Sequence, residues 1–205
     1  MSPLHPTPSL RETPSQTAGP YVHIGMTPNF CDIRGVYPAD LGADMLLGNI
    51  PGERIEISGR ILDGDGAPVI DAVIELWQAD STGTYLKPAD VLPGSFSGWG
   101  RRPMDEKGAF SINTIKPGKV PGPDGKPMAP HISLWIVARG INIGLQTRLY
   151  FEDEAEANAA DWVLNRIPAV PRRKTLIARK EAGAVPRYVL DIRLQGENET
   201  VFFDL

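Results

Sequence analysis

Arg54-Ile-Glu-Ile-Ser-Gly-Arg-Ile61 is the stretch of sequence that decides the fold. Ile55, Ile57 and Ile61 alternate with polar residues, and Gly59 falls in the same register as the isoleucines. This period of two residues is typical of a strand with one buried face and one exposed face. The sequence therefore predicts a half-buried β-strand here.

Segments on both sides of this strand extend the prediction. Asp63-Gly-Asp-Gly66 is rich in residues that tolerate positive φ, and it lacks the later acidic ligand of a calcium loop, so it predicts a turn. A helix is expected only around residues 154–164, which are rich in Ala and Glu and are stopped by Pro168. Many short strands between Gly and Pro turns favour a mainly all-β fold, an antiparallel β-sandwich. The other expected strands are Val69–Trp77, Ala109–Ile115, Ser133–Ala138, Thr147–Phe151, Tyr188–Leu194 and Val201–Phe203.

The two ends of the chain differ from this middle part. Residues 1–20 contain five prolines, which suit neither a helix interior nor a central strand. We expect residues 1–48 to be an N-terminal arm and loop segment that packs on a partner subunit, and residues 49–205 to be the β-sandwich domain. The tail, Thr200-Val-Phe-Phe-Asp-Leu205, either folds back on the sandwich or is covered by a partner.

Composition excludes several classes of function. The chain has 205 residues, 41% of them hydrophobic, which is enough for a core of its own. The net charge is −4 and the basic residues are scattered, so nothing indicates nucleic-acid binding. One cysteine, Cys31, cannot form an intrachain disulfide. No apolar run approaches the roughly 18 residues of a membrane helix, and the N-terminus lacks the pattern of a signal peptide. We expect a cytoplasmic protein that does not bind membranes.

The segment from Glu75 to Arg139 carries the candidate site. It begins Glu75-Leu-Trp-Gln-Ala-Asp80 and continues through Gly83-Thr-Tyr85 and Thr114-Ile-Lys-Pro-Gly118. It closes on Met128-Ala-Pro-His-Ile-Ser133. This order of motifs resembles the intradiol ring-cleaving dioxygenases, in which two tyrosines and two histidines hold a ferric ion. The resemblance implies a β-sandwich of the intradiol dioxygenase type.

Only two of the four family ligand positions keep a ligand residue. Tyr85 and His131 match the family pattern, whereas Val120 stands in place of the second tyrosine and Ser133 in place of the second histidine. Met128 replaces an arginine that usually stands three residues before the first histidine. Valine cannot coordinate a metal, and serine is a poor neutral ligand for a hard cation such as ferric iron. We therefore expect these to be vestigial ligand positions in a chain with no metal and no catalytic residue of its own.

The resemblance extends to the rest of the chain. The segments Thr13–His23, Ala138–Asn142, Thr147–Asp153 and Gln195–Asp204 are similar to the alpha chains of the family's two-chain enzymes. This implies a subunit that pairs with an iron-bearing beta subunit, with Fe(3+) bound by that partner, in a higher-order oligomer of alpha–beta units. It also implies that the complex cleaves protocatechuate with O2 to 3-carboxy-cis,cis-muconate in the beta-ketoadipate pathway of aromatic catabolism.

The same resemblance implies a substrate-binding role for four residues, Thr17, Gly19, Pro20 and Arg139, in the wall of a cleft at the alpha–beta boundary. Glycine lets backbone approach a planar ring closely, and proline stiffens the loop before binding. A guanidinium pairs with the substrate carboxylate through directed, charge-assisted hydrogen bonds. The alternatives are that Arg139, or Arg148 that follows closely, forms only a structural ion pair and that residues 13–21 only dock on the partner.

Two other functions stay open at this point. One is a self-sufficient catechol or hydroxyquinol dioxygenase, which Val120 and Ser133 oppose. The other is a stand-alone transthyretin-like β-sandwich that acts as a binding module, which the resemblance at both termini opposes.

Overall fold

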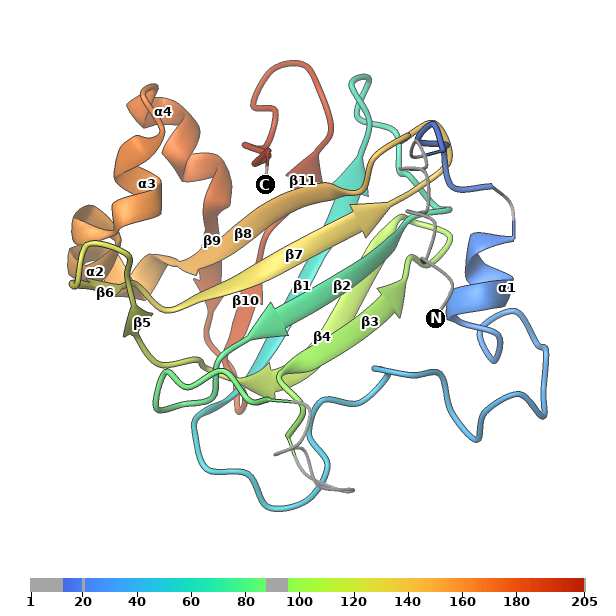
Figure 1. The fold of residues 1–205 in the computed structure, drawn as a ribbon, viewed down its shortest axis with the longest axis horizontal. Coiled ribbons are helices and arrows are strands. Elements are labelled where there is room, and N and C mark those ends of the chain that lie inside the picture. The colour runs from blue at the N-terminus through green and yellow to red at the C-terminus, as the bar shows by residue number, and fades with distance from the viewer. Residues whose placement is uncertain (1–12, 20, 88–95, 205) are drawn as a thin grey trace, which may run out of the picture.

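The computed structural model describes residues 13–19, 21–87 and 96–204 (Figure 1). One curled sheet of nine strands dominates it, as the prediction of a mainly β fold requires. Its strands are β1 (Arg54–Leu62), β2 (Val73–Gln78), β3 (Trp99–Pro103), β4 (Ala109–Ile115), β7 (His131–Val137), β8 (Leu145–Phe151), β9 (Ile177–Glu181), β10 (Arg187–Val189) and β11 (Ile192–Arg193). Their order is β11-β1-β10-β9-β8-β7-β2-β3, with β4 paired to β1. A separate ribbon pairs β5 (Val120–Pro121) with β6 (Pro127–Met128).

The mainly β fold is as expected, although the sheet is mixed and not antiparallel throughout. β1 pairs in parallel with β10 and β11, and β8 pairs in parallel with β9, whereas the other pairings are antiparallel. A parallel pair needs a crossover connection. Between β8 and β9 that connection is helical, and it carries the chain back to begin β9 beside the end of β8.

The helices are short and lie mostly in this crossover. They are α1 (Val22–Met26), α2 (Ala155–Ala160), α3 (Trp162–Arg166) and α4 (Val170–Arg173), with 3-10 turns at Glu152–Glu154 and Lys174–Leu176. The single helix predicted over residues 154–164 is two helices, because Asp161 adopts an extended backbone between them and caps α3 with its side chain. Within the described ranges, no helix has the length and apolar character needed to cross a membrane.

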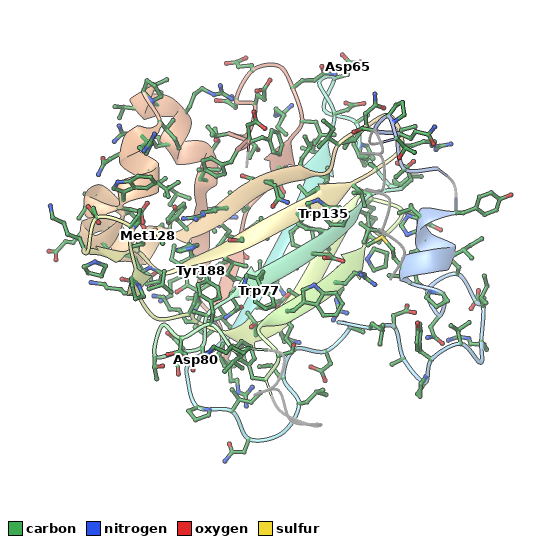
Figure 2. The ribbon with its side chains drawn as sticks, in the orientation of Figure 1. Asp65, Trp77, Asp80, Met128, Trp135 and Tyr188 are labelled. Atoms are coloured by element: carbon green, nitrogen blue, oxygen red, sulfur yellow. The ribbon has the colours of Figure 1, made fainter. Side chains whose placement is uncertain are left out.

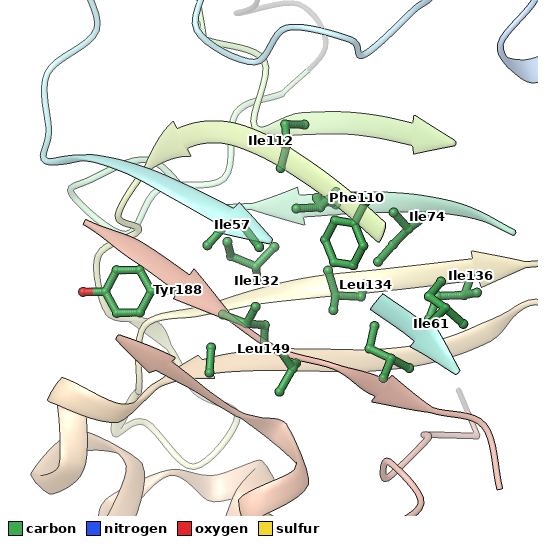
Figure 3. Packing of buried hydrophobic residues seen from close by; sticks show 14 of the residues in the cluster. Ile57, Ile61, Ile74, Phe110, Ile112, Ile132, Leu134, Ile136, Leu149 and Tyr188 are labelled. Carbon is green, nitrogen blue, oxygen red and sulfur yellow. The ribbon is translucent and has the colours of Figure 1, made fainter. Parts of the chain in front are cut away.

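The core lies between the facing halves of the curled sheet (Figure 3). Ile57 and Ile61 of β1 are fully buried and belong to the same apolar cluster as Ile132 and Leu134 of β7. The alternation read from the sequence therefore identified the inward face of β1 correctly. Gly59 lies on the same face, and a larger residue would not fit there because a Cβ would stand 1.9 Å from the carbonyl oxygen of Leu190.

Both terminal segments contact their own sheet. The Phe203 amide donates to the Gln146 carbonyl at 2.8 Å, and Phe202 packs against the main core, so the tail folds back on the sandwich. It forms an isolated bridge at Phe203 and not the strand predicted for residues 201–203. Near the other end, the Arg101 side chain donates to the Met26 carbonyl at 3.0 Å. Packing of the arm on a partner stays a prediction, and residues 1–12 lie outside the described part of the chain.

Asp161 fastens the crossover helices to β7 and β8. Its carboxylate accepts hydrogen bonds from the amides of Val163 and Leu164 at 2.9 Å each and from the Tyr150 hydroxyl at 3.2 Å. It also accepts from the Ala129 amide at 2.9 Å, just before β7. Because the Asp161 side chain is fully buried, water cannot take over as acceptor for these four donors if the carboxylate is removed.

We expect Asp161→Ala to lower the free energy of unfolding by about 2–4 kcal/mol, because it removes a helix cap and leaves buried donors unpaired. Urea unfolding followed by circular dichroism measures the change. Asp65→Ala, in an exposed turn, is the control and should stay within about 0.5 kcal/mol of the parent chain. Equal stability of the two variants would show that Asp161 does not fasten the crossover.

Candidate functional site

The four vestigial ligand positions come from three segments that converge at one end of β7. Tyr85 follows β2, Val120 lies in β5, and His131 and Ser133 lie on β7. The strand register sets their neighbours: Val120 faces Met128, His131 faces Tyr150, and Ser133 faces Arg148. Ser133 also pairs with Trp77 of β2, and Figure 2 shows where Trp77 and Met128 lie relative to the sheet.

Tyr85 and His131 meet, as the family pattern requires, but they bond to each other. The Tyr85 hydroxyl lies 3.3 Å from Nε2 of His131, and Nδ1 of His131 lies 2.8 Å from the Ala129 carbonyl oxygen. A carbonyl oxygen can only accept, so Nδ1 carries the proton, Nε2 is the acceptor and the tyrosine donates. Both side chains are therefore satisfied without a metal.

Both groups are neutral at neutral pH, although only His131 is buried and the Tyr85 side chain is 36% exposed. Loss of solvent, and then the positive charge of Arg148, lower the pKa of His131 to about 4. Burial raises the pKa of the Tyr85 phenol above its usual range, although the charge of Arg148 opposes that shift. At neutral pH the pair is thus an imidazole and a phenol, and a phenolate does not form without an additional cation.

The residues present do not fit a ferric ion. Val120 is an apolar side chain only 3% exposed, and Ser133 offers a neutral hydroxyl. Across the described ranges, no group of three or more His, Cys, Asp and Glu side chains is arranged to hold a metal. A phenol and an imidazole bonded to each other leave too few hard, anionic donors for this cation.

Arg148 also lies in this region, although the sequence pattern predicted no site role for it. Nη1 of Arg148 donates to the Tyr150 hydroxyl at 3.3 Å and lies 3.9 Å from the sulfur of Met128. The alternation in Thr147-Arg-Leu-Tyr150 already places Arg148 and Tyr150 on one face of the strand. On its other side Arg148 lines a cavity of about 550 Å³ with Trp162, Arg166, Phe202 and Phe203.

Two of the predicted substrate-binding residues, Thr17 and Arg139, lie together at the opposite end of β7. The Gly140 amide donates to the Thr17 hydroxyl at 2.6 Å, so the N-terminal arm lies against the turn that carries Arg139. Nε of Arg139 donates to Asp71 at 2.8 Å, while the arginine side chain stays 67% exposed. Around Gly19 no atom lies within 4 Å of the position a Cβ would take. Pro20 lies outside the described residues.

The structure therefore brings Thr17 and Arg139 together, but not with the vestigial ligand positions. Arg139 lies in the turn that follows β7, and the strand from His131 to Val137 alone spans roughly 20 Å at the usual rise per residue. A protocatechuate-sized molecule at one end could not touch the other. The Thr17–Arg139 cluster cannot serve the vestigial site of its own chain.

The low pKa of His131 predicts a stability that depends on pH. The folded-state pKa of about 4 lies below the ordinary value of 6.5, so the unfolded chain binds the proton more readily. The stability gained by keeping His131 neutral is fully present above about pH 6.5. As the pH falls towards 4 the free energy of unfolding decreases, by roughly 3 kcal/mol in all.

Urea unfolding of the parent chain and of His131→Gln at several pH values between these limits measures this dependence. The glutamine variant should have the flatter profile, because it lacks the titrating group. Parallel profiles for the two chains would mean that His131 is not held neutral by the fold.

Comparison with known proteins identifies the family of this chain. The dioxygenase family model matches residues 27–196. The protocatechuate 3,4-dioxygenase alpha chain of Pseudomonas putida is 47% identical over 197 residues, which cover 95% of this chain and 97% of that protein. The protocatechuate 3,4-dioxygenase beta chain of Burkholderia cepacia is 34% identical over 160 residues, 73% of this chain and 67% of that one. Among solved structures, 3-chlorocatechol 1,2-dioxygenase of Rhodococcus opacus shares the fold, with a TM-score of 0.62 at 23% identity over 78% of this chain and 67% of that one. This chain belongs to the intradiol dioxygenase family.

Proposed function

We propose that this chain is the alpha subunit, without iron of its own, of a protocatechuate 3,4-dioxygenase. The complex cleaves protocatechuate with O2 to 3-carboxy-cis,cis-muconate, a step of aromatic catabolism in the beta-ketoadipate pathway. The observation that carries the proposal is the division of β7 into two ends. One end has ligand positions that do not fit a ferric ion, and the other presents an exposed arginine beside an ordered arm.

The partner in this proposal is a beta subunit that holds Fe(3+). One beta chain is 34% identical to this chain, which supports a common ancestral fold for the two subunits. Two such chains related by a pseudo-twofold axis bring the arm end of one against the ligand end of the other. The Thr17–Arg139 cluster then lines the partner's site, and several alpha–beta units assemble into the cytoplasmic enzyme.

The role of this chain is to bind and orient the substrate. The ferric ion of the partner supplies the activation of the catechol and oxygen. Nε of Arg139 is held by Asp71, which leaves the two terminal nitrogens as donors for the carboxylate of protocatechuate. Thr17 anchors the arm through the Gly140 amide, so that Gly19 and Pro20 can form a wall that orients the ring and excludes water.

The first test is the iron content of the chain expressed alone and together with a beta chain. We expect the lone chain to be colourless and iron-free, because its ligand positions lack a second phenol and a second imidazole. The complex should contain iron, absorb visible light and cleave protocatechuate. Iron in the lone chain at one ion per molecule would show that other residues complete a site.

The second test removes the proposed carboxylate contact. Arg139→Ala in the assembled complex should lower kcat/KM for protocatechuate by roughly 10- to 100-fold, the effect of one lost charged hydrogen bond, with iron content unchanged. Catechol, which has no carboxylate, should lose less. Arg179→Ala is a matched control, because Arg179 is also exposed and paired with a neighbouring carboxylate. Unaltered kinetics with protocatechuate would remove Arg139 from the site.

A further inference from the structure

The cavity of about 550 Å³ that Arg148 lines lies where the crossover between β8 and β9 meets the C-terminal tail. Its walls come from three parts of the chain: β8, the segment 162–172 and residues 201–204. None of the four vestigial ligand positions is among the described residues that line it, and neither is Arg139. The cavity is therefore distinct from the vestigial ligand positions and from the proposed substrate contact, and its volume is in the range of small-molecule pockets.

Positive charge gathers in this cavity. Three arginines line it, Arg148, Arg166 and Arg172, against one carboxylate, that of Asp204. Arg172 pairs with Glu199 at 2.9 Å, whereas Arg148 and Arg166 form no salt bridge with any carboxylate in the described part of the chain. The chain as a whole has a net charge of −4, so the excess of cations here is a local feature. A hollow with this charge favours an anionic ligand.

The rest of the lining is mostly apolar and rich in aromatic rings. Trp162 contributes an indole from α3, and the Arg166 guanidinium stands 4.5 Å from its centroid. Phe202 and Phe203 line the cavity from the tail, and Ile167 lines it from the loop after α3. Such surroundings suit a planar apolar body, whereas the free guanidinium groups suit a carboxylate attached to it.

Hydrogen bonds fix the walls before any ligand enters. The Thr147 hydroxyl donates to the Val201 carbonyl at 2.7 Å, which holds the tail on β8. Nε of Arg173 donates to the Ile167 carbonyl at 3.0 Å, which holds the loop after α3. A pocket whose walls are already ordered loses little conformational freedom on binding.

We propose that this cavity is a binding site for a small aromatic carboxylate. The carboxylate pairs with the guanidinium groups of Arg148 and Arg166, and the ring packs among Trp162, Phe202 and Phe203. Arg148 belongs to the sheet, Arg166 to the crossover and the two phenylalanines to the tail, so the ligand joins all three parts of the chain. The site is additional to the contact proposed for Arg139, and it depends neither on a metal nor on the subunit role of the chain.

The experiment measures binding of benzoate to the full-length chain by calorimetry and by tryptophan fluorescence. Benzoate should bind at least tenfold more tightly than benzyl alcohol, which has the ring without the charge, and than acetate, which has the charge without the ring. Trp162→Phe keeps an aromatic wall and should remove most of the fluorescence change while calorimetry still detects binding. Inorganic phosphate that binds more tightly than benzoate would overturn the proposal, because it would show an anion site without a pocket for the ring.

Charge variants locate the carboxylate. Arg166→Gln and Arg148→Gln should each weaken benzoate binding at least fivefold, because each removes a charged donor. Asp204→Asn should strengthen binding about two- to threefold at low salt, because it removes the one negative charge of the lining, and a misfolded variant cannot produce such a gain. Arg179→Gln, at an exposed arginine on β9, is the control and should leave the affinity unaltered. Equal affinities of the parent chain, Arg166→Gln and Asp204→Asn would refute the assignment.

Discussion

The pairing of β7 with β2 on one side and β8 on the other is the constraint on which the rest of this structure depends. The register of these strands decides that Ser133 faces both Trp77 and Arg148, and that His131 faces Tyr150. A paired strand is extended and stiff, so the same strand also fixes how far Arg139 stands from His131. Both ends of β7 carry side chains of functional interest, and the sheet prevents them from approaching each other.

Buried polar groups explain why the vestigial end remains ordered. A buried hydroxyl or imidazole without a partner costs several times the net gain of one hydrogen bond. In this chain the Tyr85 hydroxyl bonds to His131, and His131 bonds to the Ala129 carbonyl. Tyr150 links the permanent cation of Arg148 to the carboxylate of Asp161. Hydrogen bonds and the guanidinium of Arg148 thus hold this end of the sheet together.

The sequence predicted the elements that depend on local pattern and missed those that depend on distant partners. Alternation located β1 and β4 almost to the residue, whereas β3 was missed because Trp99-Gly-Arg-Arg-Pro103 has no such alternation and is a strand only through its pairing with β2. A single helix was expected because the Ala- and Glu-rich composition hides the buried role of Asp161. The contact of Thr17 with Gly140 joins residues 123 positions apart, which no local pattern encodes.

The two ends of β7 are therefore linked in stability although they are separated in space. Arg139 can present its guanidinium at a defined place only if the strand that leads to it stays paired over its whole length. That pairing includes the end at which His131, Tyr150 and Asp161 are buried. The side chains at this end have to fill and satisfy it, because a cavity or an unpaired donor there would loosen β7 and α3 together. The buried polar cluster around His131 is therefore the structural support of the strand that leads to Arg139.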